Sequence, residues 1–71
     1  MGKNEKLVKL RLAIIQGDVD NLKALMDEVK EKEYFDELLT AAYMYAANTP
    51  AGKNHKEVMK FLAHEVDNTK C

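Results

Sequence analysis

Residues 10–18, LRLAIIQGD, decide the fold that this chain is expected to adopt, because they hold the end of one helix and the start of the next. Gly17 readily takes the left-handed conformation in which many helices end. Asp18 is a good N-terminal cap, since its carboxylate can accept hydrogen bonds from the free amides of a helix's first turn. We therefore expect a helix, a tight turn and a second helix.

Apolar residues recur at helical spacing on both sides of this turn. The first helix is expected from about Asn4 to Gln16 and the second from Asp18 onward. The stripe of the first helix consists of Leu7, Leu10 and Ile14, widened by Val8, Leu12 and Ile15. The stripe of the second consists of Val19, Leu22, Leu25, Met26 and Val29. Both helices are predicted to be half-buried.

The second half of the chain repeats the pattern after an expected bend near Lys32. A third helix is predicted from Tyr34, and because only Thr40 is polar between Leu38 and Ala47, it should be the most buried. Residues 48–54, with their Pro and Gly, predict a loop. The stripe of the last helix consists of Val58, Met59, Leu62 and Val66, with Phe61 alongside. The sequence predicts one all-α domain over residues 1–71, built as two antiparallel helical hairpins at about residues 4–30 and 34–67.

The two hairpins align with each other in sequence. At an offset of 33 residues the first helices match, and beyond the 48–54 loop the second helices match at an offset of 37. The first offset pairs Leu10 with Tyr43, Leu12 with Tyr45, Ala13 with Ala46 and Ile14 with Ala47. The second pairs Gly17 with Asn54, Asp18 with His55, Leu22 with Met59, Lys23 with Lys60, Leu25 with Leu62 and Met26 with Ala63. The four extra residues fall in the loop, where an insertion costs little closure entropy.

This pattern resembles the ankyrin repeat, whose period is about 33 residues and whose two helices are joined by a short Gly-containing turn. Residues 10–18 resemble the first helix and turn of that family, and residues 21–26 its second helix; residues 43–47 and 54–62 are similar. The Thr-Pro-Leu-His opening is absent, and residues 27–37 read as helix where ankyrin repeats carry a β-hairpin. An ankyrin-like pair of repeats and a compact bundle both stay open. The resemblance implies partner contacts near the end of each first helix, at Ile15, Gln16, Asn48 and Thr49.

No residue pattern in the sequence indicates a catalytic or metal-binding site. His55 and His64 are nine residues apart, on opposite sides of one helix, and cannot share a metal. Residues 18–21 resemble the start of a calcium loop, but Lys23 and Val29 stand where that loop needs Gly and Glu. Cys71 has no neighbour that would activate its thiol and no partner for an internal disulfide. We expect no catalytic residue, metal or cofactor.

Charge is uneven along the chain. Residues 1–16 carry a net charge of +3 and residues 17–37 a net charge of −5, while the whole chain is at −1. The basic first helix can be balanced internally by the acidic middle, or it can steer an asymmetric partner or a head-to-tail dimer. The near-neutral total argues against a dedicated nucleic-acid binder, and no apolar run is long enough to span a bilayer.

The function expected from these features is that of a cytoplasmic, non-enzymatic protein–protein interaction module or small regulator. Its partner would be another protein or a second copy of the chain. A small DNA-associated regulator and a purely structural homodimer are the alternatives.

Overall fold

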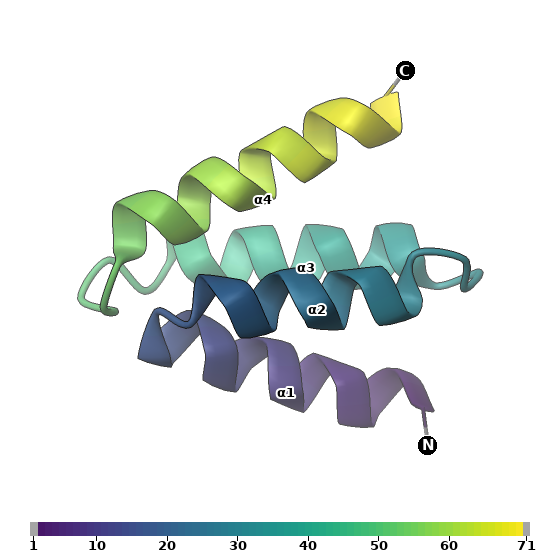
Figure 1. Cartoon of the computed structure of the whole chain (residues 1–71), viewed down its shortest axis with the longest axis horizontal. Coiled ribbons are helices and arrows are strands. Elements are labelled where there is room, and N and C mark those ends of the chain that lie inside the picture. The colour runs from purple at the N-terminus through teal and green to yellow at the C-terminus, as the bar shows by residue number, and fades with distance from the viewer. Residues whose placement is uncertain (1, 71) are drawn as a thin grey trace.

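The computed structural model describes residues 2–70, and the side chains of residues 2–68; Cys71 lies outside the described residues. This part of the chain consists of four helices and no strand: α1 (Gly2–Gln16), α2 (Val19–Val29), α3 (Phe35–Ala47) and α4 (His55–Lys70) (Figure 1). The all-α prediction is confirmed. The second hairpin, expected at about residues 34–67, includes α4 as far as Lys70, since no Gly or Pro follows Asp67.

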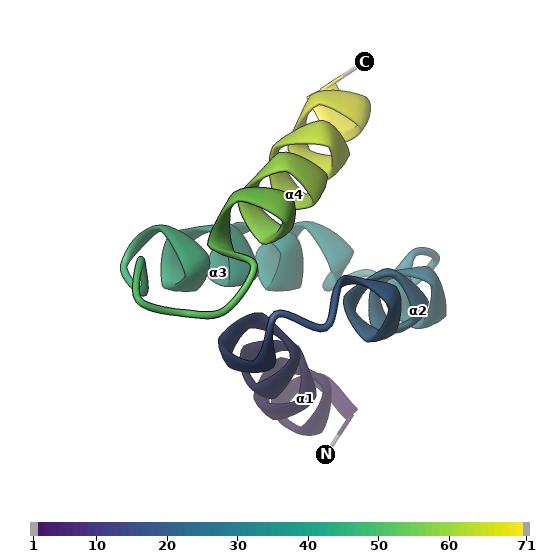
Figure 2. The ribbon, with the colours of Figure 1, turned by 60° about the vertical axis from the view of Figure 1, so that its left-hand side comes forward.

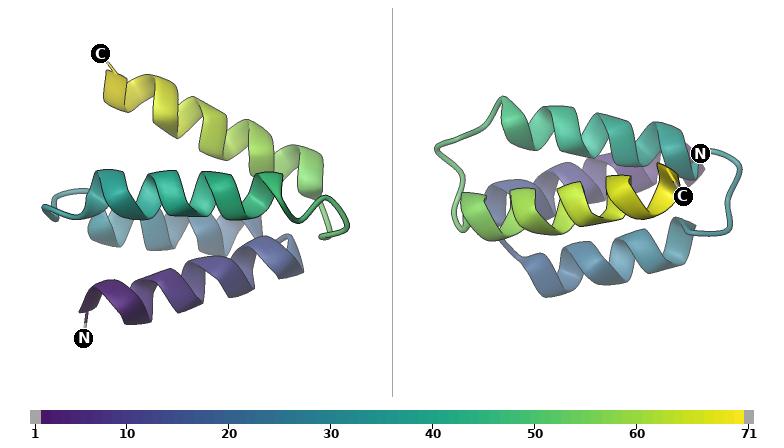
Figure 3. Two further views of the ribbon diagram at one scale, coloured as in Figure 1. Left: turned by 180° about the vertical axis from the view of Figure 1, so that it is seen from behind. Right: turned by 90° about the horizontal axis from the view of Figure 1, so that it is seen from above.

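The helices form two antiparallel hairpins, as the sequence predicts. Within each hairpin the chain reverses direction, so the first helices, α1 and α3, run in the same direction and lie side by side (Figure 3). The second helices, α2 and α4, also contact each other. Toward its C-terminus α4 diverges from α2 and α3 (Figures 1 and 2). Like helices of the two hairpins are thus stacked on each other.

The core is entirely apolar, and no polar or charged residue is buried among those with described side chains. Leu22 and Leu62, one from the second helix of each hairpin, are both fully buried. Ala13 and Ala46, which the sequence alignment pairs, are also both fully buried. The buried residues are Leu10, Ala13, Ile14, Leu22, Leu25, Met26, Val29, Leu38, Leu39, Ala42, Ala46, Val58 and Leu62. Burial of these side chains is the main stabilising contribution to the fold.

The turn in each hairpin supports the pairing of Gly17 with Asn54. Both residues have positive φ, 68° and 52°; Gly17 lies two residues before the start of α2, and Asn54 lies directly before the start of α4. The Asn54 side-chain amide donates a hydrogen bond to the Gly17 carbonyl oxygen at 3.0 Å, so the two turns are bonded to each other. A Cβ atom on Gly17 would lie 2.3 Å from the carbonyl oxygen of Lys53. This close approach requires glycine at the junction.

The predicted helix boundaries have identifiable causes. Asp18 caps α2 by accepting a hydrogen bond from the Asn21 amide at 3.1 Å. The bend expected near Lys32 is confirmed: α2 ends at Val29, and the following turn is closed by hydrogen bonds from the Lys32 amide to the Val29 carbonyl and from the Phe35 amide to the Lys32 carbonyl. The turn connects the two hairpins.

The helix α3 contacts each of the other three helices, in line with its expected central position. It is not covered on all sides, however. Thr40, Met44 and Ala47 are exposed, although two of them are apolar. The third helix of this small domain therefore has an apolar side that no other part of the described chain covers.

Candidate interaction surface

Four large hydrophobic side chains are exposed in the described part of the chain, and three of them lie on α1. Val8 is 55% exposed, Leu12 is 52% exposed and Ile15 is 44% exposed; Met44, on α3, is 58% exposed. Spacings of four and three residues place Val8, Leu12 and Ile15 on one face of α1. We call these three residues the α1 apolar stripe.

Helix geometry explains why the α1 apolar stripe is outside the core. At about 100° per residue, Leu12 lies roughly 200° around the helix from Leu10. Leu10 is fully buried with Ala13 and Ile14, so the side chain of Leu12 must face outward. The expectation that Val8, Leu12 and Ile15 simply widen the buried face is wrong, because a single face cannot accommodate both sets. The breadth of the stripe was the signal for two separate apolar faces.

The four contact residues implied by the resemblance lie at the ends of α1 and α3, which are at the same end of the molecule (Figure 1). Ile15 and Gln16 are exposed. The side chains of Asn48 and Thr49 instead bond to the C-terminal end of α3. The Asn48 side-chain amide donates a hydrogen bond to the Met44 carbonyl oxygen at 2.9 Å, and the Thr49 hydroxyl donates one to the Tyr45 carbonyl oxygen at 2.8 Å. These two side chains have a capping role, and Ile15 is the predicted residue that joins the exposed apolar surface.

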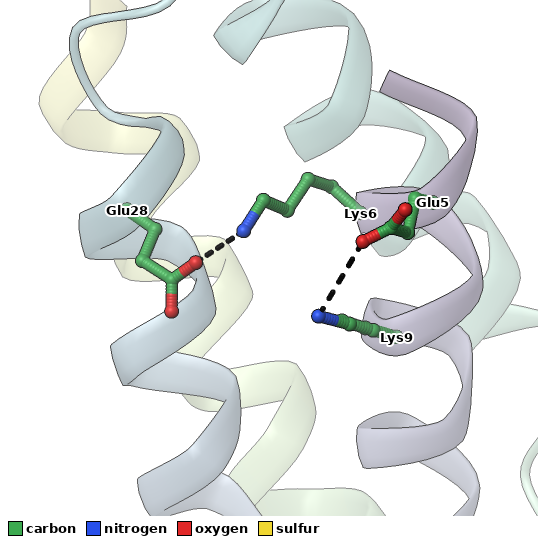
Figure 4. A network of polar contacts seen from close by, with 4 residues as sticks. All are labelled: Glu5, Lys6, Lys9 and Glu28. Carbon is green, nitrogen blue, oxygen red and sulfur yellow. Dashed lines mark hydrogen bonds and ion pairs between the residues drawn. The ribbon is translucent and has the colours of Figure 1, made fainter. Parts of the chain in front are cut away.

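The cationic side chains of α1 have partners within the chain. Lys3 pairs with Glu37 at 2.6 Å, Lys6 pairs with Glu28 on α2, and Lys9 pairs with Glu5 at 3.7 Å. Figure 4 shows the last two pairs. The fourth cation, Arg11, stacks over the ring of Tyr45 with its guanidinium carbon 5.4 Å from the ring centroid. Two of these contacts, Lys3 with Glu37 and Lys6 with Glu28, join the basic first helix to the acidic middle of the chain, so the expected internal balance is present at these two positions.

The interhelical pair of Lys6 and Glu28 perturbs both groups. The hydrogen bond that Lys6 donates raises the pKa of its own ammonium group and lowers the pKa of the Glu28 carboxyl. The Glu28 side chain is 53% exposed, so solvent screens the interaction and its contribution to stability is small. The pair joins α1 to α2 without forming a reactive site.

A groove of about 320 Å³ lies between α2 and α4. Val19 and Lys23 line it from α2, and the Lys23 ammonium nitrogen is 6.0 Å from the centroid of the Phe61 ring. The α4 side is lined by Glu57, Lys60, Phe61 and His64. The groove follows the contact between the two second helices, which spread apart along α4.

The described residues contain no group of three or more His, Cys, Asp or Glu side chains that could hold a metal ion. Within the same part of the chain, no helix is both long and apolar enough to cross a bilayer. No protein-family model, curated protein or solved structure matches the chain. The functional inference is therefore drawn from the exposed surface.

Proposed function

We propose that this chain is a non-enzymatic protein–protein interaction module that binds its partner through the α1 apolar stripe. The observation that carries the proposal is the exposure of three large hydrophobic side chains on one face of one helix. Scattered apolar residues are common on protein surfaces, whereas a contiguous row marks a surface that is covered in a complex. We place this activity in the cytoplasm, where a single cysteine stays reduced.

The cationic side chains of α1 are in contact with other groups of the chain, which favours a protein partner over DNA. A DNA-binding helix presents several cations to phosphates and bases. Lys3, Lys6 and Lys9 each have a carboxylate partner, and Arg11 covers an aromatic ring. The helix therefore offers its apolar residues to a partner and uses its cations to hold the domain together.

We further propose that the two hairpins are ankyrin-like units of a short repeat array. The support is the stacking of α1 on α3 and of α2 on α4, together with the matched turns at Gly17 and Asn54. In repeat arrays each unit covers the apolar side of its neighbour, so a terminal unit has an uncovered side. The α1 apolar stripe lies on the first unit of this chain.

The test compares proteins retained from a native lysate by three immobilised baits: the wild type, Leu12→Lys and Glu33→Gln. Both substitutions raise the net charge by one, but Glu33 lies in the exposed turn between the hairpins, away from the α1 apolar stripe. We expect a specific protein to be retained by the wild type and Glu33→Gln and lost with Leu12→Lys. Identical sets of retained proteins on all three baits would refute the proposal.

A further substitution, Ile15→Asp, tests the C-terminal end of the α1 apolar stripe. Because Ile15 is 44% exposed, we expect this variant to keep its helical circular dichroism spectrum and to lose the partner. Unfolding of Ile15→Asp would assign that side chain to the core instead.

A further inference from the structure

The contact between the two hairpins can be described by two residue pairs, one for each pair of stacked helices. Between α1 and α3, Arg11 lies over the ring of Tyr45. Between α2 and α4, the Lys23 ammonium nitrogen lies 6.0 Å from the centroid of the Phe61 ring. At both contacts the first hairpin contributes the cation and the second hairpin contributes the aromatic ring.

The internal repeat matches each of these residues with an equivalent residue in the other hairpin. At the 33-residue offset Arg11 corresponds to Met44, and Tyr45 corresponds to Leu12. At the 37-residue offset Phe61 corresponds to Ala24, and Lys23 corresponds to Lys60, which itself lines the groove facing α2. The offsets are those that match Gly17 with Asn54 and buried Ala13 with buried Ala46.

Three of the corresponding residues are exposed outside the groove between α2 and α4. Leu12 and Met44 are two of the four exposed large hydrophobic residues, and Ala24 is exposed as well. We name two faces from these positions and their exposed neighbours. The head face, on α1 and α2, consists of Val8, Leu12 and Ala24. The tail face, on α3, consists of Thr40, Met44 and Ala47.

The two faces are both apolar. The head face presents Val8, Leu12 and Ala24, and the tail face presents Met44 and Ala47. Leu12 and Met44 lie at the positions that the repeat matches with Tyr45 and Arg11, which are in contact inside the chain. The stacking of one hairpin on the other can therefore continue from one copy to the next.

We infer that a second copy of this chain docks head to tail, so that the tail face of one copy packs on the head face of the next. Met44 then contacts Leu12 of the second copy. The inference rests on the proposed function, because it assigns a partner to the α1 apolar stripe. It repeats between copies the stacking that the chain already makes between its own hairpins.

This mode of association has two physical consequences. A contact between different faces leaves one head and one tail free, so it extends into a chain of copies unless the rotation closes a ring. Each face presents only a few exposed side chains, so we expect the contact to bury less than the roughly 1,200 Å² typical of the smallest stable complexes. We therefore expect weak, concentration-dependent assembly.

The experiment is sedimentation equilibrium of the full chain from about 10 µM to about 1 mM, a range that covers weak dissociation constants. Leu12→Lys blocks the head face and Met44→Lys blocks the tail face, and Glu33→Gln is the control with the same charge change. We expect the average mass of the wild type and the control to rise with concentration. Each lysine variant alone should associate at least ten-fold more weakly. An equimolar mixture of the two should form dimers and stop there, because it contains one intact head and one intact tail.

Three results would overturn the inference. A wild-type chain that stays monomeric throughout the range refutes self-association, and the α1 apolar stripe then belongs to a different protein, which the bait comparison detects separately. Association that survives Met44→Lys but not Leu12→Lys identifies a symmetric head-to-head dimer. Failure of the equimolar mixture to form dimers rules out complementary faces.

Discussion

Replacement of Gly17 by alanine tests the junction between the two hairpins. Gly17 has φ of 68°, and its added Cβ atom would lie 2.3 Å from the Lys53 carbonyl oxygen and 2.6 Å from the Lys53 carbonyl carbon. Because both atoms are backbone, the 48–54 loop must move to relieve the overlap. The substitution therefore strains the turn in one hairpin and displaces the loop of the other.

The expected cost follows from three contributions. Left-handed backbone costs an alanine about 1–2 kcal/mol. Movement of the loop weakens two hydrogen bonds. The Asn54 side-chain amide donates one to the Gly17 carbonyl oxygen at 3.0 Å, and the Lys53 backbone amide donates the other to the Ile15 carbonyl oxygen at 3.4 Å. Each is worth about 0.5–1.5 kcal/mol. We expect a loss of about 2–4 kcal/mol in the free energy of unfolding, a large fraction of the roughly 4–10 kcal/mol typical of a chain this long.

The measurement is urea denaturation followed by helical circular dichroism, at a protein concentration low enough to keep the chain monomeric. The matched control is Gly52→Ala, since a Cβ atom there makes ordinary contacts of 3.4 Å and φ is not positive. We expect Gly52→Ala to stay within about 1 kcal/mol of the wild type. Equal stability of the two variants would refute the assigned role of the Gly17 turn.

Three further substitutions test the core, the cap and the ion pair. Leu62→Ala, at a fully buried position, should lower the free energy of unfolding by about 2–5 kcal/mol in urea denaturation; a loss below about 1 kcal/mol would contradict its burial. Asp18→Ala removes the cap on the Asn21 amide and should cost about 1 kcal/mol in thermal unfolding, whereas Asp18→Asn should restore most of it. The pKa of the Glu28 carboxyl is lowered by its hydrogen bond from Lys6. The pair therefore stabilises the fold fully at pH values above the ordinary glutamate pKa, and this contribution is lost as the pH falls through the lowered pKa. The stability difference between the wild type and Glu28→Gln should therefore shrink from pH 7 to pH 3 at constant ionic strength, and a difference that grows on acidification would contradict the assignment.

The four helices were predictable because the local signals agree. Gly17 and Asp18 mark one turn, Pro50 and Gly52 mark the other loop, and apolar residues recur at helical spacing between them. The end of α4 was less predictable, since Asn68 and the residues after it contain no strong helix breaker.

The exposed surface was harder to predict than the helices. The breadth of the apolar pattern on α1 indicates that some residues lie outside the core, but the pattern alone does not say which neighbours cover each side. Only the packing of α2 and α3 against Leu10 and Ile14 leaves Leu12 outside. In the same way, the apolar composition of α3 suggests complete burial, whereas Met44 is exposed because none of the other described helices covers that side of α3.

Disulfide cross-linking tests the head-to-tail contact most directly. Leu12→Cys and Met44→Cys are each introduced into a Cys71→Ser background, and the two proteins are oxidised alone and mixed. A disulfide forms without strain only when the two Cα atoms are about 4.4–6.8 Å apart, so it reports direct contact between the chosen positions. The account predicts that the mixed dimer of Leu12→Cys with Met44→Cys forms faster than either same-variant dimer. Equal rates for all three dimers, or fastest cross-linking of Leu12→Cys with itself, would contradict it.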